Sequence, residues 1–252
     1  TGRQRPSGVA EEGPANPMNW RRAVLSLVLF GIGFGYVEAA MVVYLRHIYD
    51  PVRHELYPTA PSGELFPLIT SDQLAAQGPA YQRLLLTELG REFATLVMLG
   101  AAALAVSSNF RQWMAGFVLS FGVWDLTFYL VLKLILGWPA SFATWDILFL
   151  LPVPWAGPVL SPAIVAATMI WAGVVVLRRE LSGQPLRISA ANWTAIVAGG
   201  VLLMLAFMWD WRNTTAGHPP NPFNWPLFWA GEGLGVAAFL HALRRRTIAY
   251  TA

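Results

Sequence analysis

Four acidic residues within strongly apolar segments are the residues of this sequence that could do chemistry, namely Glu38, Glu92, Asp125 and Glu232. A carboxylate in the hydrocarbon region of a membrane is costly, so it is usually turned inward, paired or protonated, and it marks a functional site by default. Counted along helices at ~1.5 Å per residue, all four come out at nearly the same depth in the outer half of the bilayer. We therefore predict one buried polar cluster.

Further polar residues fall at helical spacing around these acids. Side chains at i, i+4 and i+8 lie along one face of a helix, and Asp125, Tyr129 and Lys133 form such a row, as do Glu88 and Glu92. The first row could carry protons or cations, or it could be a buried ion pair with a tyrosine packed between, and both readings stay open. The residues that we expect to act as counter-charges or relay groups are Arg91, Tyr129, Lys133, Glu88 and Asp146.

The elements that must position these residues are apolar helices. The chain of 252 residues is 56% hydrophobic and 12% charged, with a mean hydropathy of +0.48, which is typical of an all-α, polytopic integral membrane protein. At about 20 apolar residues per span, we expect six transmembrane helices near residues 20–44, 84–106, 113–136, 159–177, 193–209 and 226–243.

A short apolar stretch at 141–151 lies among prolines inside the segment 138–158. It is too short to cross a membrane, so we predict a re-entrant or interfacial half-helix on the outer side. Such a segment could cover the carboxylate cluster, with Asp146 either as a fifth acid or as a cap at the start of the half-helix.

Arginine placement orients the predicted helices. Arginines gather before the first helix, in the second and fourth connections, and after the last helix, which indicates cytoplasmic N and C termini, in a cell membrane that we expect to be a bacterial inner membrane. The predicted organisation is a disordered cytoplasmic tail (1–19), a six-helix transmembrane domain (20–246) with outer loops near 48–81 and 210–225, and a cytoplasmic tail (247–252).

Glycines spaced four apart predict where helices approach closely. Gly31 and Gly35 stand in the first predicted helix, and Gly231 and Gly235 stand in the sixth. This small-xxx-small pattern permits close backbone contact in membranes. Because both pairs lie at matching depth, we expect these two helices to pack together, which would bring Glu232 toward the first helix. For the glycines themselves, ordinary interhelical packing with no chemistry is the preferred interpretation.

The composition of the chain and the motifs that it lacks limit which cofactors it could bind. The absence of cysteine excludes disulfides, thiolate metal sites and iron–sulfur clusters as features of the chain, and a net charge of +3 does not indicate nucleic-acid binding. The chain has no HExxH, P-loop or G-x-S-x-G pattern. We predict no cofactor and no metal, while bound lipid is expected. Ligation of a haem or pigment by His47 or His241 is an alternative, and an all-carboxylate site would suit protons or hard cations.

Three functions fit these features, and no catalytic residue can be assigned. A non-catalytic subunit of a larger membrane complex, in contact with lipid and other membrane subunits, requires least from the acidic residues and is the preferred hypothesis. The second is a small transporter or a proton or cation pathway through the carboxylate cluster. The third is a membrane enzyme that acts on a lipid at the outer leaflet, with carboxylates as general acid and base.

Overall fold

The structure, a computed structural model, describes residues 19–60 and 63–248, so the predicted tails at 1–18 and 249–252 lie outside the described residues. Its elements are α1 (Trp20–Leu56), α2 (Ser71–Ala76), α3 (Pro79–Ala105), α4 (Phe110–Leu136), β1 (Trp145–Phe149), β2 (Trp155–Pro158), α5 (Leu160–Leu181), α6 (Ala190–Met208), α7 (Trp211–Thr215) and α8 (Trp225–Ile248).

Most of the described chain is helical, and five helical segments, based on α1, α4, α5, α6 and α8, are long and apolar enough to cross a membrane. The prediction of a multi-pass helical membrane protein is confirmed at this level. The remaining expected span, the second at 84–106, corresponds to α3, which has 27 residues. Its N-terminal half carries the charged residues Arg83, Glu88, Arg91 and Glu92, which lower its hydropathy.

Several helices extend beyond their predicted apolar cores. The first was expected to end at Tyr44, yet α1 continues to Leu56 and α8 runs to Ile248, inside the predicted tail. The expected outer loops are also partly helical, because they contain the end of α1, α2, the start of α3, and α7. Hydropathy locates only the part of a helix that suits lipid, whereas backbone hydrogen bonds continue through polar residues beyond it.

The segment predicted as a half-helix is a β-hairpin, and that prediction is wrong. Strand β1 pairs antiparallel with β2, with Asp146 opposite Gly157 and Trp145 opposite Pro158. Proline lacks the backbone N–H that a helix interior needs, and Pro152 and Pro154 lie between the strands. Cross-strand pairing instead provides partners for the backbone groups of this partly buried segment.

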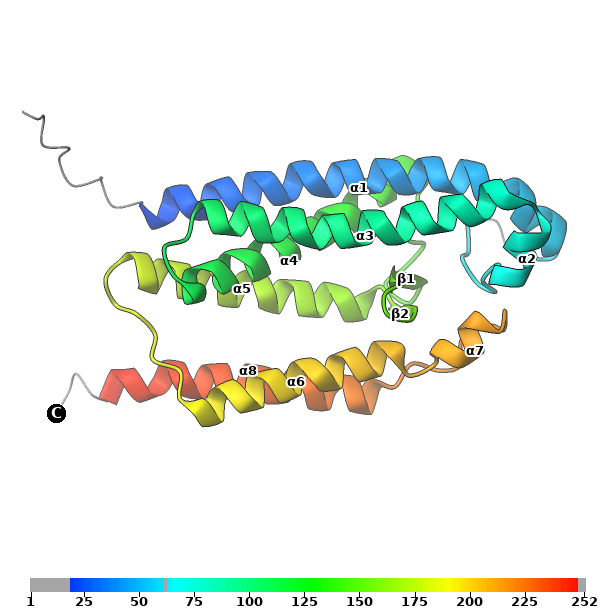
Figure 1. Cartoon of the computed structure of the whole chain (residues 1–252). Helices are drawn as coiled ribbons and strands as arrows, with labels where there is room; N and C mark the ends of the chain where they lie inside the picture. The colour runs from blue at the N-terminus through cyan, green and yellow to red at the C-terminus, as the bar shows by residue number, and fades with distance from the viewer. Residues whose placement is uncertain (1–18, 61–62, 249–252) are drawn as a thin grey trace, which may run out of the picture.

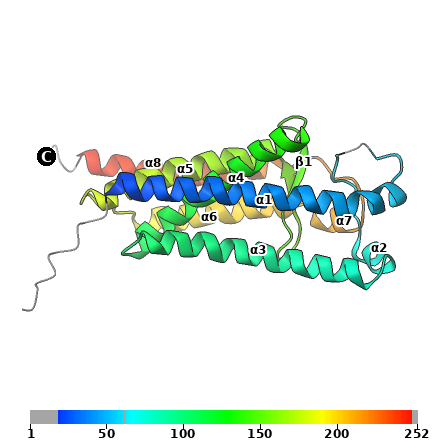
Figure 2. The ribbon, with the colours of Figure 1, turned by 90° about the horizontal axis from the view of Figure 1, so that it is seen from above.

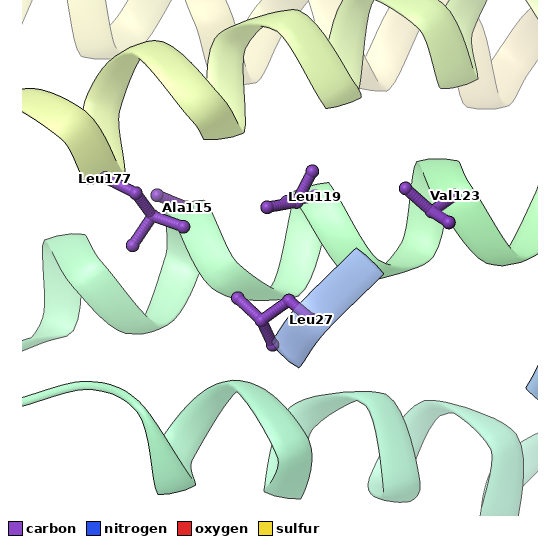
Figure 3. Packing of buried hydrophobic residues seen from close by; sticks show 5 residues of the cluster. All are labelled: Leu27, Ala115, Leu119, Val123 and Leu177. Carbon is purple, nitrogen blue, oxygen red and sulfur yellow. The ribbon is translucent and has the colours of Figure 1, made fainter. Parts of the chain in front are cut away.

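The helices form three layers in Figure 1, with α1 and α3 above, α4 and α5 between, and α6 with α8 below. Helix α4 is central and packs mainly against α1 and α5, while α6 and α8 pack mainly against each other. Seen from above, α3 runs alongside α1 over most of its length (Figure 2). Buried side chains of α1, α4 and α5 meet in one apolar cluster, consisting of Leu27, Ala115, Leu119, Val123 and Leu177 (Figure 3).

The glycines do mark close contacts, but between other helices than predicted. A Cβ atom at Gly31 would lie 2.9 Å from the Val123 side chain, and one at Gly35 would lie 2.7 Å from the Trp124 carbonyl oxygen, so both glycines face α4. A Cβ atom at Gly231 would lie 2.7 Å from the carbonyl oxygen of Gly199 in α6.

The contact of Gly235 is also with α6, because its backbone N would lie 2.9 Å from a Cβ atom at Gly199. The predicted pairing of the first and last helices is therefore wrong. A glycine pattern indicates that a helix is approached closely but carries no information on which helix approaches it.

Candidate functional site

A group of charged side chains connects α1, α3, α4 and the hairpin. At its centre, the Arg91 guanidinium of α3 forms an ion pair with Glu38 of α1. The same guanidinium contacts Glu88 of its own helix, with both Nε and Nη2 at 2.9 Å from Glu88 Oε2. Glu38 and Glu88 are buried and Arg91 is mostly covered, so Arg91 neutralises charge between two helices.

The carboxylate of Glu92, which is buried, attaches α3 to the hairpin. Both of its oxygens accept a hydrogen bond from the backbone N–H of Leu150, at 3.0 and 2.9 Å. Leu150 directly follows β1. The bond therefore satisfies a backbone donor at the end of the strand, and it holds the hairpin against the helical bundle.

Asp146 of β1 belongs to the same group. It is buried and accepts a hydrogen bond of 2.8 Å from the hydroxyl of Tyr129, which is also buried, on α4. The hairpin lies outside the membrane-spanning helices, and burial raises the pKa of Asp146 to about 6 against the opposing effects of this hydrogen bond and of the positive charge of Arg46. Asp146 therefore lies in a strand beside the acids of this group and does not cap a half-helix.

Asp125 lies one turn before Tyr129 on α4, and it is enclosed by protein. Its side chain still keeps some accessible surface, which forms part of the wall of an internal cavity. Within residues 19–60 and 63–248, no group donates a hydrogen bond to its carboxylate. The carboxylate of Asp125, which lines this cavity, is therefore free to accept hydrogen bonds there.

Two adjoining cavities lie beside these residues. The smaller has a volume of about 70 Å³, and its wall includes four carboxylates, those of Glu38, Glu92, Asp125 and Asp146. Arg91 is the one guanidinium in that wall among the residues that the structure describes. Four carboxylates to one guanidinium make this small cavity, which we call the acid chamber, a site that favours a positive charge.

The larger cavity has a volume of about 290 Å³ and shares Arg91, Glu92 and Asp146 with the acid chamber. It lies between α1 and α3, beneath α2 and residues 63–69, and we call it the outer cavity. Much of its wall is aliphatic or aromatic, from Leu45, Leu65, Leu68, Leu74, Leu85 and Phe128. A largely apolar space, with charged residues such as Arg46, Arg53 and Asp50 also in its wall, therefore adjoins the acid chamber.

Two arginines beside the outer cavity were not singled out by the sequence. Arg46 places its guanidinium carbon 4.4 Å from the ring centre of Trp138, a cation–π contact, and donates a hydrogen bond to the Gly63 carbonyl. Arg53 donates three hydrogen bonds of 2.7 to 2.8 Å to the carbonyls of residues 65–67. Both lie in the polar extension of α1, where hydropathy gave no reason to expect a helix.

Glu232 does not join this group. It lies on α8, and one of its carboxylate oxygens accepts a hydrogen bond of 2.5 Å from the hydroxyl of Thr168 on α5. Neither residue is in the wall of the acid chamber or of the outer cavity. Equal depth along the helices placed Glu232 with the other acids, but α8 packs against α6, away from α1 and α3.

Lys133 also stands apart from the acids. Its Nζ donates hydrogen bonds to the carbonyls of Gly137 and Pro139, at 3.0 and 2.8 Å, and so caps the C-terminal end of α4. The predicted row on α4 is therefore divided. Asp125 and Tyr129 face the acid chamber, whereas Lys133 serves the local backbone.

The two histidines considered for haem or pigment each have a ring nitrogen in contact with an oxygen atom of the protein. His47 is exposed and has a ring nitrogen 2.8 Å from the Val43 carbonyl of its own helix. His241 on α8 has a ring nitrogen 3.1 Å from Asn192 Oδ1 on α6. In the described part of the chain, no group of three or more His, Asp or Glu residues is arranged to hold a metal ion.

Comparisons with models of protein families, with curated proteins and with solved structures find no match to this chain.

Proposed function

We propose that this protein is a small transporter or a proton or cation pathway that uses the acid chamber as its binding site. The proposal is carried by one observation, which is that four carboxylates and one guanidinium surround a cavity that adjoins a larger one. Acidic side chains inside a membrane bundle mark ion pathways and proton relays. A positive charge is the species that such a chamber would bind most favourably.

The proposal includes six membrane spans, which are the five apolar segments and α3, with both termini cytoplasmic. The start of α1, the α3–α4 and α5–α6 connections, and the end of α8 lie at one end of the bundle (Figure 1). The arginines near that end are Arg21, Arg22, Arg111, Arg178, Arg179, Arg187 and Arg244. Positive charge collects on the cytoplasmic side, which would place the hairpin, α2 and the outer cavity on the outside.

This orientation can be tested directly, because the chain contains no cysteine. Ser107→Cys, between α3 and α4, should resist a membrane-impermeant maleimide in intact cells, and Ser141→Cys, between α4 and β1, should react with it. Reaction of Ser107→Cys in intact cells would contradict the proposed orientation. Both variants should react after the cells are made permeable, which confirms that each cysteine is present.

The pathway is tested with purified protein in liposomes. Under an imposed inside-negative potential, we expect entry of protons, followed with a trapped pH-sensitive dye, well above that of empty liposomes. Asp125→Asn should reduce this flux at least about tenfold, because it removes an acid in the chamber whose interaction with a cation exceeds ~1.4 kcal/mol. Liposomes with the unchanged protein that behave like empty ones would overturn the proposal.

Glu232→Gln is the matched control for that measurement. It also removes one buried carboxylate from a membrane helix, but Glu232 contacts Thr168 rather than either cavity. Its flux should equal that of the unchanged protein. An equal loss of flux in Glu232→Gln and Asp125→Asn would point to general damage to the bundle and would contradict a role for the chamber.

The other readings stay predictions that no observation tests. They comprise a non-catalytic subunit that contacts other membrane proteins, an enzyme that acts on a lipid at the outer leaflet, bound lipid, and residence in a bacterial inner membrane. The cavities favour the ion pathway over the non-catalytic subunit, because a purely structural role does not require an internal space lined by acidic residues.

A further inference from the structure

We propose that the ligand of these two cavities is an organic ammonium ion with an apolar body. This assignment of the ligand rests on the proposed function. Its ammonium group occupies the acid chamber and its apolar body occupies the outer cavity. The juxtaposition of an acidic space of about 70 Å³ with a largely apolar one of about 290 Å³ carries this inference.

The acid chamber fits a primary ammonium group in size and in hydrogen bonding. A volume of about 70 Å³ exceeds the ~30 Å³ that a water molecule occupies in the liquid, so a group with one nitrogen can enter. An ammonium group has three donors and no acceptor. Asp125 offers an enclosed carboxylate that receives no hydrogen bond from the described residues, so it can accept one of these donors.

The remaining acids of the chamber have partners that a ligand need not displace. Glu38 is paired with Arg91, Glu92 accepts from the Leu150 N–H, and Asp146 accepts from Tyr129. A carboxylate has several lone pairs, so Asp146 can also accept from an ammonium group beside Asp125. The positive charge would thereby offset the excess of carboxylates over guanidinium groups.

The outer cavity explains why the ligand carries an apolar body. A bare inorganic cation or proton has no apolar surface to bury against the leucines and Phe128 of this wall. Burial of apolar ligand surface there is favourable. The volume of about 290 Å³ is near the lower end of the range for small-molecule sites, ~300–1,000 Å³. The site thus suits a compact amine rather than a large drug-like molecule.

Binding to the purified full chain in detergent, followed by isothermal titration calorimetry, tests this inference with four named probes. 2-Phenylethylammonium should bind, and 2-phenylethanol, the neutral analogue, should bind at least tenfold more weakly. The anion 3-phenylpropionate should not bind measurably. Methylammonium, which lacks the apolar body, should also bind at least tenfold more weakly. Equal affinity for the alcohol and the ammonium ion, or for methylammonium and 2-phenylethylammonium, would overturn the inference.

Variants locate the ammonium group. Asp125→Asn should weaken 2-phenylethylammonium at least tenfold and leave 2-phenylethanol unchanged, whereas Glu232→Gln should change neither. An unchanged affinity of the ammonium ion in folded Asp125→Asn would overturn the inference. If that variant does not fold, the comparison of charged, neutral and truncated probes on the unchanged protein still decides.

The outcome separates this inference from the proposed function. Proton flux that depends on Asp125, together with no binding of 2-phenylethylammonium, would leave a proton or inorganic cation pathway and overturn the organic ligand. Absence of both flux and binding would overturn the two together. Binding of the ammonium ion without proton flux would support the ligand class and contradict the proton pathway.

Discussion

Two glycines in one helix should respond in opposite directions to the same substitution. Gly35 of α1 is buried against α4, where an added Cβ atom would lie 2.7 Å from the Trp124 carbonyl oxygen and 2.8 Å from Thr127 Cβ. Ordinary contacts of a Cβ atom begin at 3.4 Å. Gly33, two residues earlier, is exposed, and an added Cβ atom there meets nothing within 4 Å.

The expected magnitudes follow from two opposing effects. Replacing glycine by alanine within a helix favours the helix by roughly 0.5–1 kcal/mol, and this gain applies at both positions. At Gly35 the α1–α4 contact must open by several tenths of an ångström, which costs typically ~1–3 kcal/mol. We therefore expect Gly35→Ala to lower the free energy of unfolding by up to about 2.5 kcal/mol, and Gly33→Ala to raise it by up to ~1 kcal/mol.

The measurement is equilibrium unfolding in mixed micelles, with dodecyl sulfate as denaturant and helix content as the signal. The difference in sign between the variants is the decisive result, because both substitutions add the same methyl group to the same helix. Equal destabilisation at Gly33 and Gly35 would refute the packing of α1 on α4 through Gly35, and so would stabilisation at Gly35.

Two further predictions concern the charged residues. Arg91→Met leaves the buried Glu38 carboxylate without its counter-charge and should lower the free energy of unfolding by about 3 kcal/mol. Adding Glu38→Gln to this variant should restore at least ~1 kcal/mol. Equal stability of the single and the double variant would argue against the ion pair. Lys133→Met removes two hydrogen bonds that cap α4, so it should cost about 1 kcal/mol of stability and leave proton flux in liposomes unchanged. A flux loss like that of Asp125→Asn would make Lys133 a relay group.

The sequence predicted the acids of the site only in part. It gives the depth of a residue along its helix, but not the lateral position of that helix in the bundle. Helical rise placed Glu38, Glu92, Asp125 and Glu232 at one level, and three of them line the acid chamber. The lateral position of each helix depends on which neighbours it packs against. Glu232 was misplaced for that reason, since α8 lies with α6 on the far side of α5 from α1.

Asp146 shows the opposite case. The sequence indicated Asp146 as a candidate residue, but the segment around it was predicted to be helical. The hairpin turns its side chain toward Tyr129 and the chamber because alternate residues of a strand face opposite sides. Arg46 and Arg53 were missed because they lie beyond the apolar stretch of α1, where no hydropathy signal distinguishes a continued helix from a loop.

By itself, the sequence determined that the chain is a helical, multi-pass membrane protein and which of its polar residues fall within apolar segments. It could do so because the preference of a segment for lipid, and its helical form there, depend on that segment alone. Which helices pack together, where the hairpin inserts, and which acids share a cavity were decided only by the tertiary structure. Those properties arise from contacts between segments distant in the chain, and no local pattern of residues encodes them.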